Sequence, residues 1–155
     1  MRCIAKPAVM LLAAAAAALH TSGCAGSAGS EPQFNAVASV DEVMDGIIIP
    51  SSQTIFDAVV YSNGELIQSP KTDDDWVGVR VSALAVAEGG NLLLMPPRAR
   101  DTGDWLTFSR QLTDSAVKVA EAATAKDIER VLQTGSEMYN ACTACHEKYL
   151  EQEAQ

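Results

Sequence analysis

Apolar residues recur at helical spacing in four stretches of the chain and predict four amphipathic helices. The first helix is expected to begin at Ser39-Val40-Asp41-Glu42, which has the spacing of a capping box. Pro50 is expected to kink or break it near Ile49, because proline lacks an N–H and crowds the preceding turn. The stripe then resumes and ends at Asn63-Gly64. Its apolar members are Val40, Val43, Met44, Ile47, Ile48, Ile55, Phe56, Val59 and Val60.

The second helix is expected to follow Pro70 and Thr72, and Glu88-Gly89-Gly90 is expected to close it. Aspartates at positions 73–75 suit the positive end of its dipole. Its apolar face consists of Trp76, Val79, Ala83, Val86 and Ala87.

The third helix is expected to begin near Asp104, and Thr124 with Asp127 has the spacing of a capping box for the fourth. The third uses Leu106, Phe108, Leu112, Ala116, Val119 and Ala120. The fourth uses Ile128, Val131, Leu132, Gly135, Met138, Tyr139, Cys142, Cys145, His146 and Tyr149. No strand is predicted, since the β-branched run at 47–49 is too short. Short connections between four amphipathic helices predict an all-α, antiparallel four-helix bundle.

The last expected helix carries Cys142-Thr143-Ala144-Cys145-His146, the Cys-x-x-Cys-His signature of covalent c-type haem attachment. In a helix, positions separated by three and four residues share a face, so both thiols and the imidazole project together. The thiols would form thioethers with the two vinyl groups of one haem c. His146 would bind the iron as proximal ligand.

The two cysteines have two other interpretations. A redox dithiol belongs at a strand-to-helix junction in a βαβ setting, whereas a long helical pattern surrounds Cys142 and Cys145. A zinc site would need a fourth ligand, and the usual second Cys/His pair is missing.

The N-terminus has the pattern of an export signal. Arg2 and Lys6 precede an uncharged apolar run from Ala8 to Leu19. Twelve residues at ~1.5 Å each extend only ~18 Å, too short for a ~30 Å hydrocarbon core. We therefore expect a signal peptide at residues 1–23, consistent with haem attachment outside the bacterial cytoplasmic membrane.

Ser22-Gly23-Cys24 resembles a bacterial lipobox, which makes Cys24 the expected lipidation site, although Thr21 stands where a large aliphatic residue is usual. Ordinary cleavage nearby is the alternative. Residues 24–38, rich in Gly and Ser, are expected to form a flexible tether. They lead to a haem domain at 39–150 and a short tail at 151–155. Ala25, by the sorting rule of some enteric bacteria, favours a periplasmic lipoprotein of the outer membrane.

The chain is strongly acidic. Its formal net charge is −9, and removal of Arg2 and Lys6 leaves 9 basic residues against 20 acidic ones, or −11. Such a surface disfavours nucleic acid as a partner. It favours a redox partner protein with a basic docking patch, although solubility alone would also explain the charge.

The order of four helices with Cys142, Cys145, His146 and the aromatic Tyr149 on the last one resembles class II c-type cytochromes, the cytochrome c′ group. The resemblance covers about residues 39–150 and implies that Tyr149 contributes to the haem site. Leu150 stands where the family often has Arg, and Lys148 is the nearest basic residue. Relatives often pair through their first two helices, so a homodimer is an open expectation.

Family members differ at the sixth iron position, which is vacant in gas-binding proteins and filled by a Met of the first helix in electron-transfer proteins. His146 is the only histidine after signal cleavage, so a second imidazole is excluded within one chain. Met138 lies two turns before His146 on the same helix. Met44, Met95 and a vacant site remain, and Met44 is the expected metal ligand beside His146.

The expected function is one-electron transfer by an iron-containing, periplasmic, lipid-tethered monohaem cytochrome that is not an enzyme. Binding of NO or CO at a vacant site is the alternative. Catalysis would need polar acid–base groups beside the iron. The acidic residues are scattered along the helices, and no pair of them has a spacing that indicates a catalytic site. The apolar connection at 91–103 is expected to pack over the haem edge. Its Arg98 and Arg100 are candidate partners of the haem propionates.

Overall fold

The computed structural model describes residues 34–153. The expected signal peptide at 1–23, the lipidation site Cys24 and most of the expected tether lie outside these residues. Within the described part, each helix is too short or too polar to cross a lipid bilayer.

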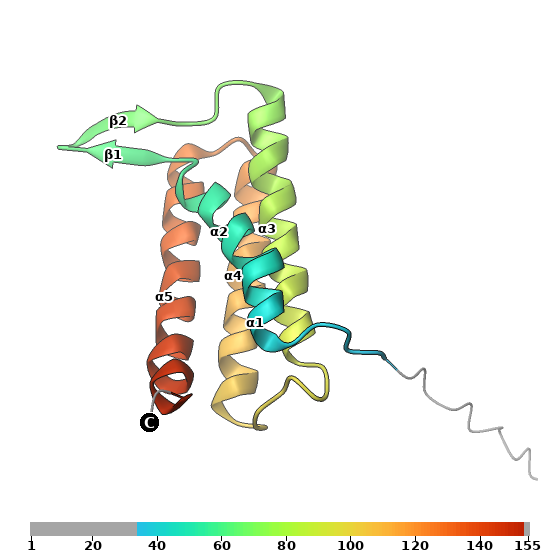
Figure 1. The fold of residues 1–155 in the computed structure, drawn as a ribbon. Helices are drawn as coiled ribbons and strands as arrows, with labels where there is room; N and C mark the ends of the chain where they lie inside the picture. The colour runs from blue at the N-terminus through green and yellow to red at the C-terminus, as the bar shows by residue number, and fades with distance from the viewer. Residues whose placement is uncertain (1–33, 154–155) are drawn as a thin grey trace, which may run out of the picture. The chain divides into compact units, whose positions relative to one another are not determined.

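The described chain is mostly helical, as predicted, and its helical segments run alternately up and down (Figure 1). The first segment consists of α1, a π-helix (η1) and α2, and it leads through a β-hairpin to three long helices. The elements are α1 Val40–Val43, η1 Met44–Ile48, α2 Ile49–Phe56, β1 Val60–Ser62, β2 Glu65–Gln68, α3 Asp73–Leu93, α4 Asp104–Thr124 and α5 Ile128–Glu153. Helix α4 lies between α3 and α5 and packs extensively on both. Helix α5 ends at Glu153, so it extends into the tail expected at 151–155.

The first helical segment begins with the predicted capping box. Ser39 Oγ accepts from the Glu42 N–H at 3.2 Å, and Glu42 Oε2 accepts from the Ser39 N–H at 2.8 Å. Pro50 was expected to kink or break the helix near Ile49, and the helix is not broken there. A π-helix over 44–48 changes the hydrogen-bond register, and Pro50 falls in the first turn of α2. There its missing N–H is tolerated, so the helix continues.

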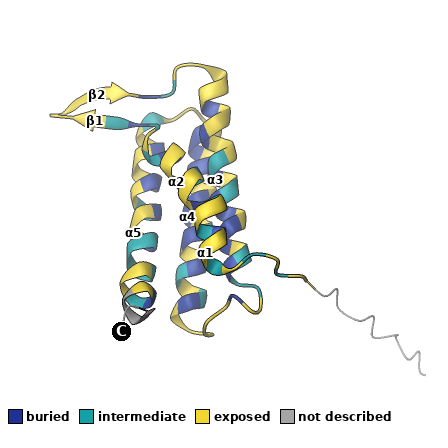
Figure 2. Cartoon of the chain, in the orientation of Figure 1, coloured by how far each residue is buried: buried dark blue, intermediate teal, exposed yellow. Residues whose placement is uncertain are grey.

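The predicted helix over Val59–Asn63 is also wrong, because a two-stranded antiparallel hairpin occupies this stretch. Asn63 and Gly64 have φ of 52° and 83°. Two successive left-handed residues suit a type I′ turn, whose twist matches that of paired strands. The hairpin projects sideways at one end of the bundle and is largely exposed (Figure 2). Tyr61 Oη donates to Glu129 Oε1 at 2.5 Å, and this hydrogen bond links the hairpin to α5.

The sequence predicts that Gly89 and Gly90 end this helix, and that prediction is wrong. Helix α3 continues to Leu93, and both glycines lie buried inside it. A Cβ on Gly89 would lie 2.6 Å from Ile48 Cγ1, and one on Gly90 would collide with Thr113 Oγ1 of α4. The two glycines therefore allow η1 and α4 to approach the α3 backbone closely.

The start of α5 differs from prediction by three residues. Thr124 belongs to α4, where its hydroxyl donates to the Ala120 carbonyl. Asp127 caps α5 instead, with Oδ1 accepting from the Arg130 N–H at 3.0 Å. The expected Thr124–Asp127 box is thus replaced by a simple Asp cap.

The core lies between the inner faces of α3, α4 and α5 and the first helical segment (Figure 2). Its largest fully buried side chains are Val43, Val86, Leu93, Val119, Val131 and Met138. Arg98 is also buried, and its Nε donates to the Ala38 carbonyl at 2.8 Å. The end of the expected flexible tether is therefore fixed to the α3–α4 connection.

Candidate haem site

A cavity of about 540 Å³ lies between the first helical segment and α5. Its lining residues are Met44, Ile48, Ile49, Ser52, Gln53, Phe56, Leu93, Phe108, Ser109, Leu112, Tyr139, Ala141, Cys142, Thr143, Cys145, His146, Glu147 and Leu150. Most of these side chains are apolar. The structure therefore places Cys142, Cys145 and His146 on the wall of a largely apolar cavity.

The packing of the first helical segment explains the cavity. At its upper end, Phe56 meets Tyr139 of α5 edge-on, with ring centroids 5.8 Å apart. Further down, Ile48 packs against Gly89 of α3, and the segment runs diagonally away from α5 (Figure 1). The two helices thus meet at Phe56 and Tyr139, and the cavity lies beside this contact.

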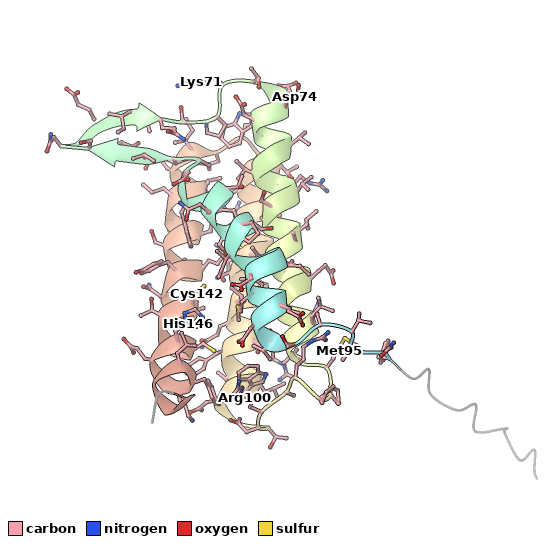
Figure 3. The ribbon with its side chains drawn as sticks, in the orientation of Figure 1. Lys71, Asp74, Met95, Arg100, Cys142 and His146 are labelled. Carbon is pink, nitrogen blue, oxygen red and sulfur yellow. The ribbon has the colours of Figure 1, made fainter. Side chains whose placement is uncertain are left out.

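Cys142, Cys145 and His146 share the face of α5 that borders this cavity. Figure 3 shows Cys142 and His146 on the side of α5 that faces α4 and the first helical segment. Both cysteines are free and partly buried, whereas His146 is exposed. Two thiols and one imidazole therefore reach the same space, as the spacing predicts.

Both thiols are held in the protonated form. Burial raises the pKa of Cys142 to about 11, with a smaller contribution from Cys145. Burial also raises the pKa of Cys145, although Arg100 opposes the shift. Reactive redox cysteines instead have lowered pKa values, often at helix N-termini. The position of both residues well inside α5 therefore disfavours the dithiol interpretation.

No group of three or more His, Cys, Asp and Glu side chains in residues 34–153 is placed to hold a metal ion.

The two candidate methionine ligands lie in different places. Met44 is half-buried at the start of η1 and lines the cavity together with His146. Met95 is not among the lining residues and lies on the α3–α4 connection, away from Cys142 and His146 (Figure 3). Met138 is fully buried in the core.

Tyr149, expected at the haem site by resemblance, is not among the cavity-lining residues. Its ring is buried edge-on against Trp105, with centroids 5.0 Å apart, and lies 6.5 Å from that of Phe108. Its hydroxyl donates to Asp101 Oδ2. Tyr149 therefore fixes the end of α5 next to His146 rather than forming the cavity wall.

The basic residues near the site have different surroundings. Arg98 is buried and donates to the carbonyls of Ala38 and Leu92, at 2.8 and 3.2 Å, so its role as a propionate partner is not supported. Arg100 lies on the connection with its guanidinium carbon 5.4 Å from the centre of the Trp105 ring, and its charge acts on Cys145. Lys148 pairs with Asp104 of α4 at 2.6 Å.

The connection at 91–103 is shorter than expected, because Leu92 and Leu93 belong to α3. Leu93 lines the cavity, whereas no residue of 94–103 is among the lining residues. The expected packing of this segment over the haem edge is therefore supported only for Leu93.

Sequence analysis did not identify two cavity residues, Ser52 and Ser109. Both are buried, and neither hydroxyl has a hydrogen-bond partner. The available signal was their position on apolar helix faces: Ser52 follows Ile48 by four residues, and Ser109 precedes Leu112 by three.

Comparison of the chain with protein-family models, curated proteins and solved structures gave no match.

Proposed function

We propose that this chain is a monohaem c-type cytochrome that transfers single electrons outside the bacterial cytoplasmic membrane. One observation carries the proposal: Cys142, Cys145 and His146 share a wall of an apolar cavity with Met44, which comes from a different helix. A helical pair of thiols followed by an imidazole suits covalent attachment and axial ligation of one porphyrin.

The cavity fits a haem in size and chemistry. Its volume of about 540 Å³ lies within the usual range for cofactor sites, roughly 300–1,000 Å³. The protonated, partly buried thiols suit thioether formation better than thiolate redox chemistry. Two buried hydroxyls without partners, those of Ser52 and Ser109, provide hydrogen-bonding capacity that a group inside the cavity would use.

When bound, the haem supplies an iron that changes oxidation state by one electron. Cys142 and Cys145 would hold it covalently, and His146 would provide a ligand to its iron. The apolar side chains of Ile48, Leu93 and Leu112 line the inner part of the cavity and would shield that part of the haem from water. Such shielding favours the iron state of lower charge, which raises the reduction potential.

Met44 is the proposed sixth ligand, because it lines the cavity with His146 and lies on a different helix. A thioether at this position raises the potential further. It would also exclude small gases from the iron, which separates electron transfer from the alternative of NO or CO binding.

The sequence supports the setting of this function. An export signal and a lipobox-like Cys24 suggest a lipid-tethered protein in the periplasm, with the outer membrane favoured. The acidic charge suits a redox partner that presents a basic patch, since complementary charges accelerate encounter.

The visible absorption spectrum of the oxidised, reduced and CO-treated reduced protein tests this function. Electron transfer with Met ligation predicts sharp low-spin bands, a thioether-to-iron charge-transfer band in the oxidised state and little response to CO. A high-spin reduced spectrum that changes at once with CO would overturn the Met44 assignment and favour gas binding.

A further inference from the structure

Four serine and threonine side chains are buried inside the helices of the described chain, and they fall into two pairs. Ser115 Oγ donates to the Gln111 carbonyl at 2.7 Å, and Thr134 Oγ1 donates to the Arg130 carbonyl at 2.6 Å. This bond to the carbonyl four residues earlier is the usual solution for a hydroxyl in a helix. The hydroxyls of Ser52 and Ser109 make no such bond and have no other partner.

The two unpartnered hydroxyls share one location. Ser52 comes from α2 and Ser109 from α4, yet both line the cavity that holds Cys142, Cys145 and His146. Ser52 is 6% exposed and Ser109 is 2% exposed, so bulk water does not satisfy them. A buried hydroxyl without a partner is unfavourable by about 1–3 kcal/mol. Two of them from different helices on the wall of one cavity indicate that a polar atom belongs in it.

We propose that Ser52 and Ser109 donate hydrogen bonds to an oxygen atom that the bound haem brings into the cavity. The inference rests on the proposed haem function. A hydroxyl can donate or accept, and a haem with its ligands offers hydrogen-bond acceptors. The oxygen belongs to a propionate carboxylate or, when Met44 is removed or leaves the iron, to a small ligand bound in its place.

The test uses the haem-loaded full chain with Ser52→Ala, Ser109→Ala and the double substitution. Ser115→Ala is the matched control, because it removes a buried hydroxyl of α4 that bonds to the backbone outside the cavity. Retained haem content and helical circular dichroism show that each variant is folded.

The first measurement is the resonance Raman bending mode of the haem propionates. If a propionate is the acceptor, loss of a donor weakens its hydrogen bonding and shifts this mode to lower frequency in the serine variants. The Ser115→Ala protein keeps the parent frequency.

The second measurement is the stretching frequency of CO bound to the reduced protein in a Met44→Ala background, in which the sixth position is open. A hydrogen-bond donor near the ligand oxygen favours electron donation from iron into CO and lowers this frequency. If the axial ligand is the acceptor, the double serine variant therefore shows a higher C–O frequency.

A shift in either measurement supports the proposal and identifies the source of the oxygen. Serine variants that match the Ser115→Ala control in both measurements would overturn it. Absence of covalent haem from the parent protein is a separate outcome that contradicts the proposed function, and with it this inference.

Discussion

The Tyr149 hydroxyl donates a hydrogen bond to Asp101 Oδ2, which joins the C-terminal part of α5 to the connection just before α4. The other oxygen of the same carboxylate accepts from the N–H groups of Gly103 at 2.7 Å and Trp105 at 3.2 Å. The Tyr149 hydrogen bond, helped by these two N–H groups, holds the pKa of Asp101 below its usual range. A single carboxylate thus fixes the turn of α5 that follows His146.

Tyr149→Phe removes this hydrogen bond and is expected to lower stability in a pH-dependent way. A carboxyl group with a depressed folded-state pKa contributes stability above its unfolded pKa, about 3.9 for Asp, and loses it as pH falls through the depressed value. The parent protein should therefore be more stable than the variant at pH 7, and the difference should shrink as the pH falls towards 3. Urea unfolding at several pH values measures it.

At the alkaline end, burial and the hydrogen bond to Asp101 raise the pKa of Tyr149. The contribution of the Tyr149 hydroxyl to stability should therefore persist to about pH 10 and disappear as the pH rises through its raised pKa.

Tyr61→Phe is the control for both pH ranges, because it removes an exposed Tyr–Glu hydrogen bond at the hairpin. An equal loss of stability for Tyr149→Phe at pH 3 and pH 7 would show that Asp101 does not mediate the effect.

Gly89→Ala is expected to destabilise the protein by about 1–3 kcal/mol, as overpacking in a dense core does. The added Cβ would lie 2.6 Å from Ile48 Cγ1, so η1 must move away from α3. Gly78→Ala in the same helix meets no atom within 4 Å and should increase stability by up to about 1 kcal/mol. Chemical denaturation compares the two, and a gain for both variants would contradict the close packing of η1 on α3.

Met44→Ala is expected to convert the haem protein from low-spin to high-spin and to permit rapid CO binding, because the iron loses its proposed sixth ligand. Visible absorption and CO titration measure both effects. Met95→Ala is the matched control and should retain the parent spectrum, since Met95 does not line the cavity. A low-spin Met44→Ala protein would exclude Met44 as ligand.

Local signals predicted much of this fold correctly. The Ser39–Glu42 capping box and the apolar stripes of α3, α4 and α5 act within one or two helical turns, so the sequence alone shows them. The spacing of Cys142, Cys145 and His146 likewise specifies a shared helix face. The side chains that line the cavity with them come from other helices, and spacing along one helix does not contain that information.

The errors arose where a local signal has two structural solutions. Asn63-Gly64 can end a helix or form a type I′ turn, and the pairing of β1 with β2 decides between them. Gly89 and Gly90 can end a helix or allow close packing, and the approach of Ile48 and Thr113 decides. Pro50 can break a helix or lie in the first turn of one, and the π-helix that ends at Ile48 places it in the first turn of α2.

The mass of the mature protein, produced in a bacterial host that attaches c-type haem, tests the central claim most directly. The account predicts that the parent polypeptide gains the mass of one haem, retained after denaturation, and that the Cys142→Ala/Cys145→Ala variant gains none. A parent protein with the mass of the bare polypeptide and two free thiols would contradict it.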